Sequence, residues 1–207
     1  MKTKRKALLL SLCAVLLVVA SVMGTMAYLT STDSVENTFT VGKVEITLDE
    51  KDTDNSTSTA DRDKANSYLL VPGEEYEKDP TVHVKPVSEN SYIFVKVENG
   101  LAAYEDATSD VEGGYKSIAD QISAKGWGKL EGVDGVDNVY YQEYSKVAPT
   151  ATADTDLVVF EKFKLKDTAN EVAGWDSLNV KITITAYAVQ SAGFDSAKEA
   201  WIAANFV

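Results

Sequence analysis

The longest alternating stretch of the chain, Leu178 to Gln190, limits the possible folds most narrowly. Every second residue from Val180 to Ala188 is apolar, and the residues between them are mostly lysine and threonine. This period of two is the pattern of a β-strand with one buried face and one polar face. The stretch Phe39 to Leu48 alternates in the same way and predicts a second half-buried strand. A chain built on such strands must pair them into sheets.

Shorter strands are predicted between these two. They span Tyr68–Val71, Thr81–Lys85, Ser91–Glu98, Trp127–Leu130, Asn138–Tyr144 and Leu157–Leu165. Ser91–Glu98 is almost entirely apolar, so a central position is expected for it. Helical spacing predicts short helices within Glu112–Gly126 and Asp195–Ala203, and the polar stretch Asp49–Lys64 predicts a mobile loop. Strands separated by loops favour an all-β domain with short helical insertions, specifically an antiparallel β-sandwich or jelly roll.

The N-terminus has the layout of an export signal. Four basic residues lie within the first six positions, and an apolar run follows from Ala7 to Met23. Small residues at Thr25 and Ala27 fit the −3 and −1 positions of a signal-peptidase site, so cleavage is expected between Ala27 and Tyr28. Residues 1–27 are therefore predicted to form a signal peptide in a helix, followed by a segment 28–38 and a domain 39–207. An uncleaved N-terminal anchor is the alternative.

Composition narrows the partners of the mature protein. Removing residues 1–27 takes away four basic and no acidic residues and changes the formal net charge from −12 to −16 over the remaining 180 residues. Such a chain repels nucleic acid and anionic membrane surfaces, so neither is expected as a partner after cleavage. The only cysteine, Cys13, is lost with the signal, and stability outside the cell must come from packing.

The sequence offers little catalytic chemistry. His83 is the single histidine, which excludes the two-histidine zinc helix of metalloproteases. Since Val82 and Val84 flank it on a predicted strand, His83 is expected to face solvent. The stretch Asp52–Asn55 begins like a calcium loop, but Ser56 and Thr57 depart from that pattern, so a solvated acidic loop is expected. No enzyme activity, catalytic residue, cofactor or metal is predicted.

Three stretches carry a family likeness. They are GTMAYLTSTDSVENTFTVGKVEITL at 24–48, LVPGEEYEKDPTVHV at 70–84 and ITAYAVQSAGFDSAKEAW at 184–201. Together they resemble the TasA/camelysin-like exported proteins of Gram-positive bacteria. The residues that match the N-terminal pattern are Gly24, Thr25, Ala27, Tyr28, Leu29, Asn37, Phe39, Gly42, Ile46 and Leu48.

The resemblance implies a secreted structural protein of the biofilm matrix or cell surface. It implies processing by a dedicated SipW-type signal peptidase and a jelly-roll domain that self-associates into fibres. In such fibres the mature N-terminal segment of one subunit completes a sheet of the next. The apolar candidates for this donated strand are Tyr28, Leu29, Val35 and Phe39, which do not all lie on one face. The alternative for this segment is a disordered mature terminus.

A different class of function is left open by the residues. A monomeric surface module could bind a carbohydrate or a host protein through exposed aromatic side chains. The candidates for such a surface are Trp127, Tyr140, Tyr141, Tyr144 and Trp175.

Overall fold

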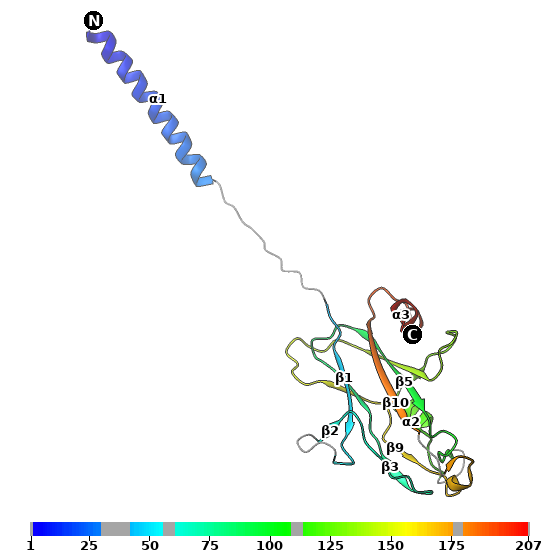
Figure 1. Cartoon of the computed structure of the whole chain (residues 1–207). Helices are drawn as coiled ribbons and strands as arrows, with labels where there is room; N and C mark the ends of the chain where they lie inside the picture. The colour runs from blue at the N-terminus through cyan, green and yellow to red at the C-terminus, as the bar shows by residue number, and fades with distance from the viewer. Residues whose placement is uncertain (1, 30–41, 56–60, 109–113, 176–179, 207) are drawn as a thin grey trace. The chain divides into compact units, whose positions relative to one another are not determined.

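The computed structural model describes residues 2–29, 42–55, 61–108, 114–175 and 180–206 (Figure 1). The chain forms two compact units, Met1–Thr40 and Val41–Val207. The first unit contains one helix, α1 (Lys2–Leu29), and the second contains every described strand.

Helix α1 follows from its composition, because leucine and alanine are strong helix formers and the run contains no proline or mid-helix glycine before Gly24. Its apolar side chains from Leu8 to Val19 are exposed. A search of the described residues finds no helix with the length and apolar content needed to cross a membrane.

The second unit is mostly β. Its strands are β1 (Ile46–Lys51), β2 (Arg62–Asp63), β3 (Glu75–Glu77), β4 (Thr81–Val84), β5 (Ser91–Asn99), β6 (Gly128–Lys129), β7 (Val139–Tyr144), β8 (Thr155–Val158), β9 (Lys162–Lys164) and β10 (Ile182–Gln190). Its helices are α2 (Ile118–Ala124), the 3-10 turn η1 (Ala169–Glu171) and α3 (Ala197–Ala204). All pairings between these strands are antiparallel, as the all-β prediction requires.

In the described residues the strands form two four-stranded sheets and one two-stranded sheet. The strand orders are β2-β1-β4-β8, β10-β5-β7-β6 and β3-β9. The central position predicted for Ser91–Glu98 is confirmed, because β5 pairs with β10 on one side and with β7 on the other.

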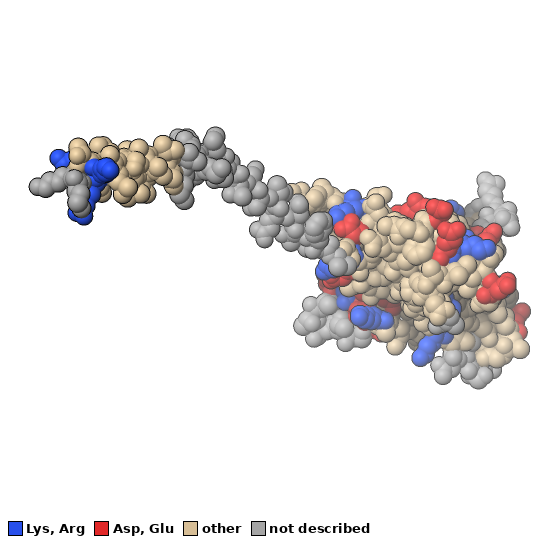
Figure 2. Space-filling view, turned by 90° about the horizontal axis from the view of Figure 1, so that it is seen from above, with Lys and Arg blue, Asp and Glu red and all other residues tan. Residues whose placement is uncertain are grey.

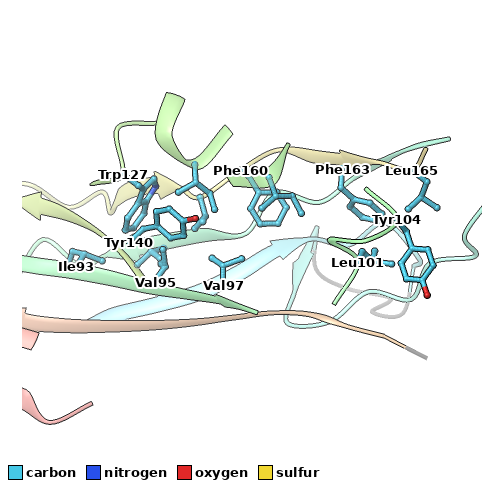
Figure 3. Packing of buried hydrophobic residues seen from close by; sticks show 14 of the residues in the cluster. Ile93, Val95, Val97, Leu101, Tyr104, Trp127, Tyr140, Phe160, Phe163 and Leu165 are labelled. Atoms are coloured by element: carbon cyan, nitrogen blue, oxygen red, sulfur yellow. The ribbon is translucent and has the colours of Figure 1, made fainter. Parts of the chain in front are cut away.

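One hydrophobic cluster is built from both four-stranded sheets. Val82 and Val84 of β4 are fully buried in it, as are Ile93 and Val95 of β5. Figure 3 shows the β5 side chains facing Phe160 across this cluster. Full burial of one such side chain contributes about 1.5–3 kcal/mol, so this cluster is the main source of stability.

A second cluster lies on the other face of β5. Phe94 and Tyr92 of this strand pack there with Trp201 and Ala200 of α3. Strand β5 is therefore apolar on both faces because each face is covered, one by the first cluster and the other by α3.

Both predicted helices are present with capping that explains their starts. Ser117 accepts a hydrogen bond from the backbone of Asp120 and completes a capping box, so α2 begins at Ile118. The prediction placed Tyr115 on this helix, but it precedes the cap. Ser196 caps α3 by accepting from the backbone N–H of Glu199.

Three strand predictions need correction. The first strand begins at Ile46 and runs on to Lys51, while residues 39–41 lie outside the described residues. Tyr68–Val71 alternates between half-buried and exposed side chains but belongs to none of the described ladders. Leu157–Leu165 is not one strand: it is divided between β8 and β9, which belong to different sheets. Buried Val159 and Phe160 lie at the break, so continuous apolar character here reflects burial rather than one continuous strand.

The expected mobile loop Asp49–Lys64 is also wrong in its described parts. Asp49–Lys51 extends β1, and Arg62–Asp63 returns as β2, with Glu50 opposite Asp63. The Asp52 N–H donates to the Asp61 carbonyl and closes this hairpin at 3.0 Å. The polar composition predicted a loop wrongly because ion pairs, not apolar contacts, hold the hairpin. Residues 56–60 of the predicted loop lie outside the described residues.

Candidate functional site

Two strand edges of the second unit have unused pairing capacity. Strand β10 pairs only with β5, so its other edge is free over Ile182–Gln190 in the described ladders. Strand β1 pairs with β4 over Ile46–Asp49, and on its other side β2 covers only Glu50 and Lys51. Ile46–Asp49 therefore also presents an unpaired edge. Such edges carry rows of N–H and C=O groups that can accept another strand.

A groove of about 1240 Å³ is lined by both edges. Figure 1 shows β1 and β10 close to each other at this side of the unit. Ile46 and Leu48 of β1 and Ile182 and Ile184 of β10 line it, and all four are half-buried against the first cluster. The groove thus has apolar walls between two unpaired backbone edges.

The third wall of the groove is the segment Lys64–Leu70, and the remaining lining comes from scattered positions. These are Lys78, Pro80, Leu101, Phe163, Trp175 and further residues of β10 and its approach, Val180–Ala186. Trp175 is half-buried beside Tyr104, with ring centroids 5.9 Å apart.

One end of the groove is charged. Glu50 projects to the same side of β1 as Ile46 and Leu48, and its carboxylate forms an ion pair with Lys78. The two residues are 5% and 8% exposed. Asn66 Nδ2 donates to the other carboxylate oxygen of Glu50 at 3.0 Å. The pair is therefore a buried and hydrogen-bonded polar group in the lining of the groove.

His83 lies on the opposite face of β4 from the valines, as the sequence predicted, but it is not free in solvent. Its Nδ1 lies 2.6 Å from Asp156 Oδ1 of β8, and its Nε2 lies 2.9 Å from Asp49 Oδ1 of β1. Arg62 of β2 also donates to Asp49 and to Asp79. His83 therefore links three strands, and Lys85, directly after β4, pairs with Asp154.

The electrostatics of this group favour a doubly protonated imidazole. Burial opposes protonation, but hydrogen bonds and charge from Asp49 and Asp156 outweigh it and raise the pKa of His83 above its ordinary value. Burial similarly opposes ionisation of Asp49, yet hydrogen bonds from Arg62 and His83 lower the pKa of that carboxyl. Each histidine nitrogen must carry a proton to donate to its own carboxylate.

The free energy of unfolding should therefore depend on pH through His83. Because the folded pKa is raised, its contribution is complete below about pH 6.5 and is lost as pH rises through the folded pKa. Asp49 acts oppositely and loses its contribution as pH falls below about 4. Urea unfolding should therefore show a higher free energy of unfolding at pH 6 than at pH 9, and His83→Gln should remove most of that difference. An equal difference in the variant would contradict this role of His83.

A group of three acidic residues lies at the β1–β2 hairpin. Carboxylate oxygens of Asp52, Asp54 and Asp63 are within 4.8 Å of one another. Two of these carboxylates already serve the fold: Asp54 accepts from the Ser67 N–H at 2.6 Å, and Asp63 accepts from the Ala65 N–H at 3.2 Å. Their physical role in the described structure is to hold the segment that follows β2.

The aromatic residues expected for a binding surface are mostly internal. Trp127, Tyr140 and Tyr144 are buried in the first cluster, and the Trp127 indole N–H donates to the Val158 carbonyl at 2.9 Å. Tyr141 is half-buried against Phe94, with ring centroids 6.3 Å apart. Three of the five candidates therefore cannot stack on a sugar at the surface.

The residues predicted for processing and strand donation fall mostly outside the described side chains. Ala27, Tyr28 and Leu29 lie in α1, and only their backbone is described. Val35 and Phe39 lie outside the described residues. What sequence reasoning missed is the groove itself, since neither free edge can be identified until the strand order is known.

The surface of the second unit carries both signs of charge. Figure 2 shows red and blue side chains interspersed over one face, with uncharged surface between them. Exposed pairs such as Lys51–Glu77 and Lys162–Glu75 contribute to this mixing. Basic residues of the first unit are confined to the start of α1.

No family model matches this chain, and neither the curated proteins nor the solved structures that were compared with it contain a match.

Proposed function

We propose that this protein is an exported structural subunit that assembles by strand donation, as its resemblance to the TasA/camelysin-like proteins implies. The observation that carries the proposal is the apolar groove between the free edges of β1 and β10. The donated strand is the N-terminal segment 28–38 of a second copy. Its backbone would satisfy the unpaired groups, and alternate side chains would enter the groove.

Length and composition suit this occupant. Extended at about 3.3 Å per residue, the eleven residues 28–38 reach about 36 Å, and nine residues of β10 span about 30 Å. Leu29 and Val35 share one parity and would lie on one face of an extended strand, and Phe39, directly after the segment, has the same parity. Asp33 and Glu36 of the segment are acidic, while Lys64 and Lys181 line the groove beside Asp49 and the paired Glu50 and Lys78.

The described backbone upstream of β1 favours a second copy over the same chain. The Glu89 N–H donates to the Lys43 carbonyl at 3.0 Å, and the Lys85 N–H donates to the Glu45 carbonyl at 2.9 Å. These bonds continue the line of β1 backwards from Ile46 to Lys43. A return of the same chain into the groove would need a reversal immediately before Lys43.

In this proposal the two four-stranded sheets are the layers of a jelly-roll sandwich, and the donated strand lies between their open edges. Residues 1–27 are the signal peptide, and a SipW-type peptidase cuts between Ala27 and Tyr28. Cleavage frees Tyr28 to begin the donated strand, so processing and assembly are coupled. The mature protein is then a secreted fibre subunit of a Gram-positive matrix or cell surface.

Three forms of the protein test this function. Protein that starts at Tyr28 should form fibres visible by electron microscopy and large species in size-exclusion chromatography. Protein that retains residues before Tyr28, and protein that starts at Phe39, should stay monomeric because the donor is blocked or missing. Equal polymerisation of all three forms would reject strand donation. A monomeric Tyr28 form with protected amides in residues 28–38 would instead indicate that the segment folds onto its own chain.

A further inference from the structure

The segment Tyr68–Val71 has the side-chain pattern of a strand but no ladder. Tyr68 and Leu70 are half-buried against the first cluster, while Leu69 and Val71 project outward. A strand that is apolar on both faces is normally covered on both. Here the inward face is covered and the outward face is not, so half of the expected contacts are missing within the described chain.

This segment is held in place by side chains from neighbouring elements. Tyr76 Oη accepts from the Val71 N–H at 2.6 Å and donates to the Leu69 carbonyl at 3.0 Å. At the other end, Asn66 Oδ1 accepts from the Thr53 N–H at 2.6 Å, which ties the segment to the β1–β2 hairpin. The segment is thus positioned at both ends without using a sheet ladder.

An aromatic group fixes the inward face. Tyr68 packs edge-on against Phe163 at 5.5 Å and against Tyr76 at 5.9 Å between centroids, and Tyr76 stacks on Phe163. Burial among these rings raises the pKa of Tyr68 to about 12. With Tyr68 anchored inward, the alternation of an extended backbone directs Leu69 to the other side.

Leu69 is 88% exposed, more than any other large apolar residue described in the Val41–Val207 unit. It nevertheless lines the groove, as does Val180, which is 38% exposed at the start of the β10 side. An exposed leucine beside an apolar groove is available to close over whatever enters it. Leu69 therefore connects the uncovered outward face of Tyr68–Val71 with the groove that is the proposed acceptor site.

We propose that Leu69, in the Lys64–Leu70 wall of the groove, closes over the donated segment 28–38 of a second copy. The inference rests on the proposed function and identifies a residue that would determine affinity. The segment needs no large rearrangement, because its anchors to Tyr76 and to the β1–β2 hairpin are already made.

A peptide-binding measurement tests this wall. The acceptor is protein that starts at Phe39, which retains both hydrophobic clusters in one compact unit and lacks its own donor. The probe is a fluorescent peptide of residues 28–38, measured by anisotropy, with a scrambled peptide of equal composition as reference. Leu69→Ser should bind the peptide at least tenfold more weakly, because a leucine side chain loses its burial. Leu69→Met should bind like the parent.

The matched control is Ile202→Ser, which removes a 55% exposed isoleucine from α3, a helix outside the groove lining. It should leave peptide affinity within twofold of the parent. Both variants should keep the parental melting temperature, since each changes an exposed side chain. Unchanged or tighter peptide binding by Leu69→Ser would contradict the proposal that Leu69 closes over the donated segment. It would not contradict strand donation itself. Failure of the parent to bind the native peptide over the scrambled one would instead reject the proposed function.

Discussion

Replacing Lys78 with methionine should lower the free energy of unfolding by about 3–5 kcal/mol. The substitution keeps an unbranched side chain but removes the charge that faces Glu50. Both residues are almost fully buried, at 8% and 5% exposure, so the remaining carboxylate would stay in the interior without its cation. Asn66 would still donate a hydrogen bond to one oxygen of this carboxylate. Urea unfolding followed by fluorescence measures the change.

A double variant separates the charge penalty from simple loss of contact. Glu50→Leu combined with Lys78→Met removes both charges, and most of the lost stability should return, because an apolar pair can replace a buried ion pair at little cost. Lys51→Met removes a lysine from the exposed pair with Glu77 and should cause no measurable change. If the double variant were less stable than Lys78→Met alone, the buried charge would not be the cause of the loss.

The same pair explains why part of the fold could not be derived from sequence. Glu50 belongs to a polar stretch that predicts a loop, yet it lies on the buried face of β1. It can do so because its carboxylate pairs with Lys78, which is 28 positions away in the sequence. His83 is a second example. Its flanking valines correctly placed it off the apolar face, but its partners Asp49 and Asp156 are brought to it only by the register of β1, β4 and β8.

Strands whose pattern is local were predicted well. The alternation in β10 and the apolar run of β5 gave the correct elements, because each pattern records which faces are covered. Such local patterns could not predict the groove. It depends on which edges are left unpaired, and that is a property of strand order, not of any single strand. Tyr68–Val71 combines both cases: its pattern is that of a strand, but no partner is present in the described chain.

Trp201→Ala should lower the free energy of unfolding by about 3–5 kcal/mol, because it empties the centre of the second cluster. The indole is 4% exposed and contacts three rings, with centroids 5.1 Å from Phe94, 5.4 Å from Tyr187 and 5.2 Å from Phe206. Calorimetry of the protein that starts at Phe39 would measure the loss, with Ile202→Ala on the same helix expected within about 0.5 kcal/mol of the parent.

The effect should reach the groove, since Tyr187 lies on β10, whose free edge forms one wall. Helix α3 covers one face of this sheet, and the groove borders the strand at its edge. Hydrogen exchange should therefore accelerate in β10 of Trp201→Ala more than in β4, which belongs to the other sheet. Equal acceleration in the two strands would mean that α3 supports the whole unit uniformly. Selective acceleration in β10 would mean that the C-terminal helix keeps the acceptor edge in shape for an incoming strand.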